Sequence, residues 1–79
     1  MNKIDKFLLR LTLKERQKAQ LIIARLIDRD WTGLNIKKLR GYQNLFRCRE
    51  GNLRIVFESD DKNVTLIKIG NRDDTTYNF

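Results

Sequence analysis

Three arginines near the middle of the chain have the type and spacing to do chemistry. Arg47, Arg49 and Arg54 lie in the stretch FRCREGNLRIVFE, residues 46–58. On both sides of Gly51-Asn52, apolar and polar residues alternate, which predicts two strands of a β-hairpin joined by a tight turn. The apolar side chains would share one face and the three guanidinium groups the other. Arginine's planar fork of donors is well suited to binding phosphate.

These arginines could bind an anion, or they could only keep one face of a sheet in water. Side chains directly across a strand pair lie about 4.5 to 5.5 Å apart at Cβ, so like charges there repel unless an anion lies between them. Scattered charges of both signs would solubilise a sheet better than three guanidinium groups on one hairpin face. The pattern therefore favours anion binding over solubility.

The charge of the whole chain agrees with an anionic partner. Its 79 residues include 17 Lys and Arg against 10 Asp and Glu, a net charge of +7. Basic residues outnumber acidic ones by eight to four in residues 1–30 and by six to two in 31–58, but not in 59–79, where the ratio is three to four. A small domain this basic suggests nucleic acid, or an acidic protein that masks it. Solubility alone is the alternative.

Cysteine and histidine usage limits the chemistry further. Cys48 is the single cysteine and histidine is absent, so neither an internal disulfide nor a zinc site is expected, and no cofactor is predicted. A reducing, cytoplasmic setting follows. Charges at Lys3, Asp5, Lys6 and Arg10 interrupt the apolar residues of the N-terminal segment, which therefore resembles neither a signal peptide nor a membrane span.

Two helices are expected before the hairpin. Apolar residues at the spacing i, i+3, i+4, i+7 predict a short amphipathic helix over residues 3–11; they are Ile4, Phe7, Leu8 and Leu11. Thr12 and Glu15 have the spacing of a capping box, which predicts a second helix running to about Asp30. The two helices should form a hairpin that ends near Trp31 and Gly33.

The rest of the chain predicts strands. Residues 34–44 are interpreted as a basic connection with a turn at Gly41, and VTLIKIG, residues 64–70, as a third strand that is apolar on both faces and therefore covered on both sides. This order predicts a single α+β domain over residues 1–79, with a helical hairpin packed on an antiparallel sheet of about three strands. The core face of the sheet should carry Phe46, Cys48, Leu53, Ile55 and Phe57.

Three segments taken in order resemble the RelE/ParE toxin superfamily. They are KKLRG at 37–41, FRCREGNLRIVFE at 46–58 and VTLIKIGNRDDTTY at 64–77. The resemblance covers about residues 37–77, and the helical hairpin agrees with it. It implies the toxin of a toxin-antitoxin pair, whose cognate antitoxin would cover the basic face. The family's usual first strand has no counterpart, because the helical pattern begins by Lys3. The sheet edge so exposed would be a site for strand addition by a partner.

RelE-like members of this superfamily cut mRNA in the ribosomal A site, where the RNA 2′-hydroxyl attacks the adjacent phosphate without a metal. By resemblance, Arg54 is the arginine that stabilises the phosphate, Arg72 the arginine after a Gly-x step, and Tyr77 an aromatic residue that stacks on a base or assists proton transfer. Contacts to the RNA backbone are expected from Arg47, Arg49, Lys37, Lys38, Arg40 and Lys68. A guanidinium is a poor proton acceptor, so the general base is undetermined.

Other readings remain open. From the residues alone, Arg72 could pair with a neighbouring acid and Tyr77 could cap the core. A ParE-like toxin would have the same scaffold and would inhibit DNA gyrase by binding it. The absence of histidine, together with arginine at 47 and 49 where RelE has lysine, favours this alternative. A basic RNA-binding module without activity is the third possibility. No membrane partner is expected.

Overall fold

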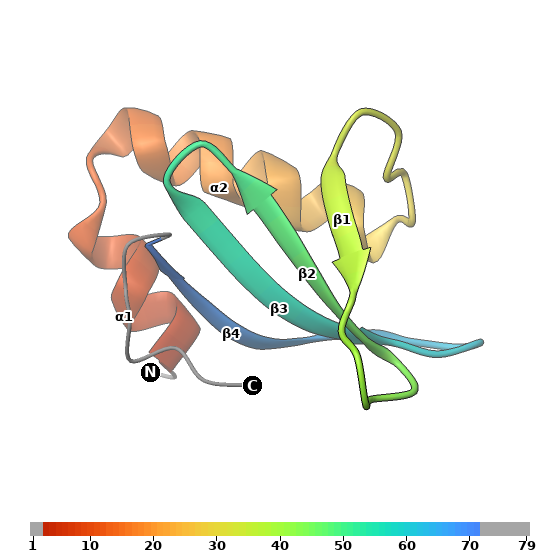
Figure 1. Cartoon of the computed structure of the whole chain (residues 1–79). Coiled ribbons are helices and arrows are strands. Elements are labelled where there is room, and N and C mark those ends of the chain that lie inside the picture. The colour runs from red at the N-terminus through yellow and green to blue at the C-terminus, as the bar shows by residue number, and fades with distance from the viewer. Residues whose placement is uncertain (1–2, 72–79) are drawn as a thin grey trace.

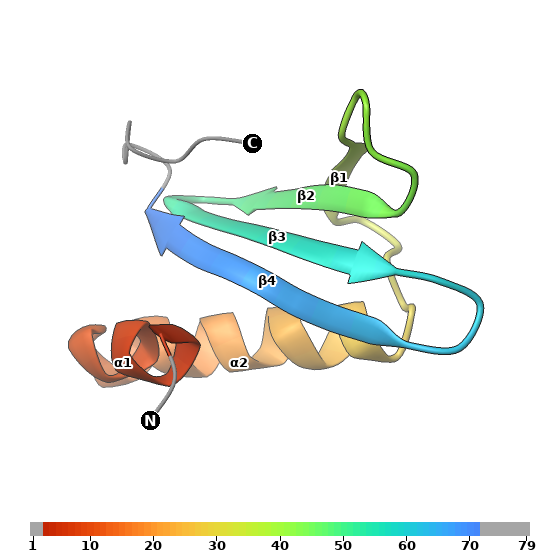
Figure 2. The same ribbon diagram turned by 90° about the horizontal axis from the view of Figure 1, so that it is seen from below.

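Two helices cover one face of a four-stranded antiparallel sheet (Figures 1 and 2). The computed structural model describes residues 3–71. Its elements are α1 (Lys3–Arg10), α2 (Leu13–Ile27), β1 (Asn35–Lys38), β2 (Leu45–Glu50), β3 (Leu53–Ser59) and β4 (Val64–Asn71). The strands lie in the order β1-β2-β3-β4. The predicted α+β class and helical hairpin are confirmed, but the sheet has four strands rather than three.

The helical hairpin is held at its turn by the predicted capping box. The Thr12 hydroxyl accepts from the Glu15 N–H at 3.2 Å, and the Glu15 carboxylate accepts from the Thr12 N–H at 3.1 Å. These bonds satisfy backbone donors that would otherwise be orphaned at the start of α2. Arg16 extends from α2 to α1 and donates to the carbonyls of Leu8 at 3.0 Å and Leu11 at 3.4 Å. One arginine thus caps the C-terminal end of α1.

Helix α2 ends at Ile27, before the expected end near Asp30. Asp28 is its C-cap, and Arg29 takes a left-handed conformation with φ of 60°. Such a residue cannot continue a right-handed helix. The Arg29 guanidinium donates to the Ser59 hydroxyl at 2.6 Å and to the Asp60 carbonyl. The turn after α2 is thereby tied to the end of β3.

The additional strand, β1, lies within the segment that was predicted as a connection. It pairs antiparallel with β2, placing Ile36 opposite Cys48 and Lys37 opposite Arg47. Ile36 is its single apolar residue, and the alternation is therefore too weak to indicate a strand. Pairing with β2, rather than an apolar face of its own, defines this strand.

Strand β4 has an exposed apolar residue, Ile67, so the expectation that both of its faces are covered is wrong. A register shift explains its apolar pattern: Leu66 pairs with Phe57 but Lys68 pairs with Val56, which leaves Ile67 as an extra residue. Such a bulge changes which face the following side chains point to. Ile67 is accordingly 41% exposed, although apolar residues surround it in the sequence.

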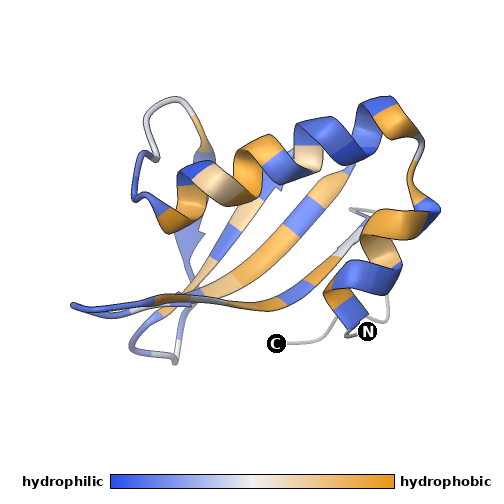
Figure 3. Cartoon of the chain, turned by 180° about the vertical axis from the view of Figure 1, so that it is seen from behind, coloured by the Kyte–Doolittle hydropathy of each residue, from blue (hydrophilic) through white to orange (hydrophobic). Residues whose placement is uncertain are grey.

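The core lies between α2 and the covered face of the sheet, whose strands show alternating hydrophobic and hydrophilic bands (Figure 3). Three aromatic rings meet there: Phe57 lies 5.3 Å from Trp31 and 5.6 Å from Phe46, between ring centroids. The predicted core face is confirmed, since Cys48, Ile55 and Phe57 are buried and Phe46 and Leu53 pack against them. None of the helices in residues 3–71 is long and apolar enough to cross a membrane.

Candidate nucleic-acid interface

The sheet face away from the helices, called the open face below, collects five cationic side chains. Strand register arranges it in rows across the sheet. One row contains Asn35, Arg49, Arg54 and Gly70; the next contains Lys37, Arg47, Val56 and Lys68. Because the side-chain period of a strand is two, the residues between these rows point to the helices instead. The register therefore confirms that the three hairpin arginines share one face opposite the core.

Arg49 and Arg54 are directly opposite each other in the antiparallel pair of β2 and β3. Like charges in this relation destabilise a sheet unless an anion compensates them. The acidic residue nearest in sequence, Glu50, pairs with Leu53 and so belongs to the helix side of the sheet. Two adjacent guanidinium groups form a fork of donors of the kind that holds phosphate oxygens.

Arg47 adds a donor that is already desolvated. Its Nε is buried and has no hydrogen-bond partner within the described part of the chain. Burial lowers the pKa of the Arg47 guanidinium below its ordinary value, and the positive charges of Arg49 and Arg54 lower it further. An anion bound here would supply both an acceptor and a counter-charge, since a buried donor without a partner carries a free-energy cost.

Val56 explains how this face carries charge while excluding water. It is only 1% exposed although neither described helix covers its side of the sheet (Figure 2). In its row it lies between Arg47 on β2 and Lys68 on β4, both half-buried. Long basic side chains can pack their aliphatic stems on apolar surface while the charged ends stay accessible. The open face thus includes one buried apolar residue between two basic side chains.

The structure brings together five of the nine predicted site residues: Lys37, Arg47, Arg49, Arg54 and Lys68. Lys38 pairs with Phe46, so its side chain belongs to the helix side. Arg40 is exposed in the loop between β1 and β2. Arg72 and Tyr77 lie outside the described residues. Their predicted roles remain predictions.

Asn35 completes a row of the open face and was not predicted from the sequence. It pairs with Arg49, and its N–H donates to the Glu50 carboxylate at 3.3 Å. No pattern in the sequence could have indicated it, because β1 itself is recognisable only through its pairing.

The open face includes one described strand position with a carboxylate, Glu58, which pairs with Leu45. Glu58 follows Arg54 by four residues along β3, which is about 13 Å at the usual rise of a strand. A general base must lie within hydrogen-bond reach of the proton that it takes. Glu58 is therefore not assigned as the general base.

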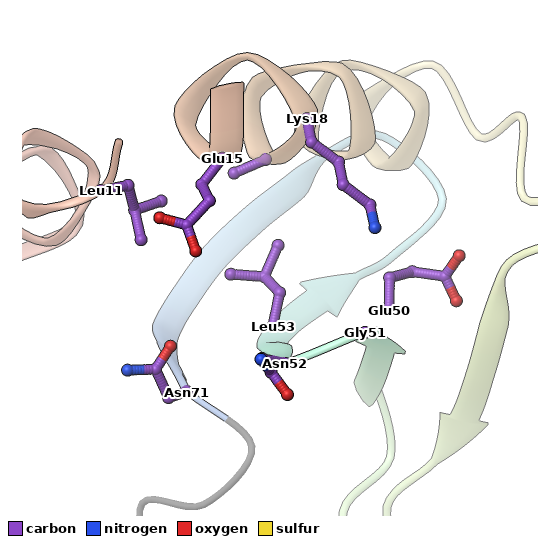
Figure 4. Close-up of a pocket in the computed structure, with 9 residues that line it drawn as sticks. Leu11, Glu15, Lys18, Glu50, Gly51, Asn52, Leu53 and Asn71 are labelled. Carbon is purple, nitrogen blue, oxygen red and sulfur yellow. The ribbon is translucent and has the colours of Figure 1, made fainter. Parts of the chain in front are cut away.

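A pocket on the other side of the sheet does not fit an anion. Its volume is about 260 Å³, and it lies between the start of α2, the turn after β2 and the end of β4 (Figure 4). Lys18 is balanced there by Glu15 and Glu50. The Glu15 carboxylate is already bound to Thr12, and its pKa is lowered by those hydrogen bonds. The open face is therefore the better candidate for binding an anion.

Comparison with known proteins agrees with this geometry. No protein-family model and no curated protein matches the chain. A solved structure does: the crystal structure of the RelB-RelE antitoxin-toxin complex from Methanococcus jannaschii, with a TM-score of 0.70 and 28% sequence identity. The match covers 90% of this chain and 87% of that chain. The fold implied by the resemblance in the sequence is thereby confirmed, and the chain is RelE-like in its fold.

Proposed function

We propose that the chain is the toxin of a type II toxin-antitoxin pair and that it cuts mRNA on the ribosome. The observation that carries this proposal is the directly opposed pair Arg49 and Arg54, with Lys37, Arg47 and Lys68 in the adjacent row. Five cations gathered on one sheet face suit a phosphate backbone. The similarity to a protein solved in an antitoxin-toxin complex supports the toxin role.

In this proposal the substrate supplies the nucleophile. The 2′-hydroxyl loses its proton to a base, the bond from O2′ to phosphorus forms, and the bond from phosphorus to O5′ breaks. The 5′ oxygen then takes a proton, leaving a 2′,3′-cyclic phosphate on the other fragment. Arg54 and Arg49 donate to the phosphate oxygens as negative charge grows on them. Arg72 and Tyr77 are proposed, by family resemblance, to complete the site.

The proposed partners follow from the charge. A net charge of +7, with five basic residues on the open face, favours an acidic antitoxin that covers this face when the toxin is held inactive. The proposed site of action is the cytoplasm, where translating ribosomes are found. No cofactor is proposed.

A ParE-like action on DNA gyrase is the second candidate. Arg47 and Arg49 stand where a lysine could have acted as proton acceptor, and the chain lacks histidine. A protein that only binds its target needs no general base.

Expression of the chain in bacterial cells distinguishes the two actions. The mRNA endonuclease should arrest growth with translation stopping first and new mRNA ends appearing within codons. Arg54→Ala and Arg72→Ala should each abolish the arrest, while Lys14→Ala, an exposed charge on α2, should leave it intact. Intact mRNA with induction of DNA damage signalling would instead establish the gyrase action. Undiminished toxicity of both arginine variants would refute the site assignment.

A further inference from the structure

Tyr42 differs from the other described aromatic residues in its exposure. Phe57 is buried, and Phe7, Trp31 and Phe46 are half-buried, but Tyr42 is 45% exposed. It does not belong to the hydrophobic core around the three packed rings. The Tyr42 side chain therefore lies at the surface, where a ligand can reach it.

The loop that carries Tyr42 stands beside the open face. Residues 39–44 join β1 to β2, and Figure 2 shows this loop rising from the sheet on the side opposite the helices. The loop is closed by the Leu39 N–H, which donates to the Leu45 carbonyl at 2.8 Å, and the Asn44 carbonyl accepts from the Ser59 N–H at 2.9 Å. These bonds tie both ends of the loop to the sheet.

The surroundings of Tyr42 are basic. The loop lines a shallow hollow together with Lys38, whose side chain belongs to the helix side of the sheet, and Arg40 precedes Tyr42 by two residues. Residues 38–43 contain no acid. Leu45, the first residue of β2 after the loop, is about 13 Å from Arg49 along the strand. The loop therefore begins one row beyond the cationic rows of the open face, and the row between them contains Leu45 and Glu58.

We propose that Tyr42 stacks on a base of single-stranded RNA whose backbone crosses the open face, with Arg40 contacting a flanking phosphate. This inference rests on the proposed function, because it requires RNA on the open face. Single-stranded nucleic acid is bound where a cationic groove tracks the backbone and aromatic rings hold the bases. The open face supplies the first feature and Tyr42 the second.

Fluorescence anisotropy with a labelled single-stranded RNA of about eight nucleotides, a length within the site sizes of such surfaces, tests this inference. Tyr42→Leu keeps an apolar side chain but removes the π-face, and should weaken binding about 10-fold. Tyr42→Phe and Tyr42→Trp should bind within about two-fold of the wild type, because both can stack. The salt dependence of Tyr42→Leu should match that of the wild type, whereas Arg49→Gln should lower the slope by about 0.7.

A second readout does not depend on how well the Leu variant folds. In Tyr42→Trp the new indole should be quenched when the same RNA binds, measured against the wild-type protein, whose Trp31 gives the background signal. Wild-type affinity in Tyr42→Leu, an unquenched Trp at position 42, or failure of the wild-type protein to bind the RNA would each overturn the inference. The proposed cleavage is judged separately by mRNA ends in cells. If Arg49→Gln binds weakly while Tyr42→Leu binds normally, the open face still binds RNA and only the role of Tyr42 is refuted.

Discussion

Replacing Arg49 with glutamine should make the isolated protein more stable and a weaker RNA binder. Arg49 and Arg54 are directly opposite each other in the sheet. For two charges about 6 Å apart, Coulomb repulsion is about 0.7 kcal/mol in water and about 2.8 kcal/mol at an effective dielectric constant of 20. Both side chains are half-buried, and salt screens the exposed part of the interaction. A gain of about 0.5 to 1 kcal/mol is therefore expected.

Thermal unfolding followed by circular dichroism measures this gain. For a domain of this size, 1 kcal/mol shifts Tm by about 4 to 8 °C, so Arg49→Gln should raise Tm by roughly 2 to 8 °C at low salt. Added phosphate should narrow the difference, because an anion between the two guanidinium groups stabilises the wild type selectively. RNA affinity should fall by about 10-fold or more, because a charge-assisted hydrogen bond is lost.

Lys14→Gln is the matched control, since it removes one positive charge from an exposed position of α2. It should change Tm little and RNA affinity only slightly. If Arg49→Gln lowers Tm and leaves RNA affinity unchanged, Arg49 is a structural residue and the open face is not a strained anion site.

Three further outcomes are expected. The pKa of the Cys48 thiol is raised to about 11, chiefly by burial and also by Glu50. A thiol reagent at pH 8 should therefore label Cys48 only at the rate at which the native state opens. Immediate labelling would contradict its burial. The Asp60 carboxylate accepts N–H bonds from Asn63 and its neighbour, which lower its pKa. The stability that this carboxylate contributes is present above its ordinary pKa near 3.9 and is lost as pH falls through the lower native pKa. In Asp60→Asn, the free energy of unfolding measured in urea should therefore fall less steeply below about pH 4.5. The same pH dependence as in the wild type would argue against this role of Asp60. Phe57→Ala removes a fully buried ring and should cost about 3 to 5 kcal/mol in urea unfolding; a loss under 1 kcal/mol would mean that the packing is wrong.

Local signals in the sequence were sufficient for much of the fold. The capping box at Thr12 and Glu15 fixes the start of α2 through bonds within one turn, and alternation around Gly51 fixes the faces of the β-hairpin. Each depends on residues that are neighbours in the sequence. Such features can be predicted without knowing the tertiary partners.

The errors arose where tertiary partners decide the structure. β1 has one apolar residue, Ile36, and is a strand because its backbone pairs with β2. In β4, the extra residue Ile67 shifts the face of the following side chains, so an edge strand resembled a buried one. The early end of α2 depends on the left-handed turn at Arg29, a conformation that arginine does not favour on its own.

The candidate site was predictable in part for the same reason. Alternation alone placed three arginines on one face, and the order of motifs added Lys37 and Lys68. Alternation could not show that Lys38 points to the helix side, because β1 was not recognised. The exposure of Tyr42 likewise became visible only with the loop in place.

Cleavage of a defined mRNA by purified protein on programmed ribosomes is the most direct test of the proposed function. Wild-type protein should cut within the A-site codon and leave a 2′,3′-cyclic phosphate, and Arg54→Ala should be strongly impaired. An mRNA with a single 2′-deoxy nucleotide at the scissile position should remain intact, because it lacks the attacking hydroxyl. Intact wild-type mRNA, or unchanged cleavage of the 2′-deoxy substrate, would contradict the proposed reaction.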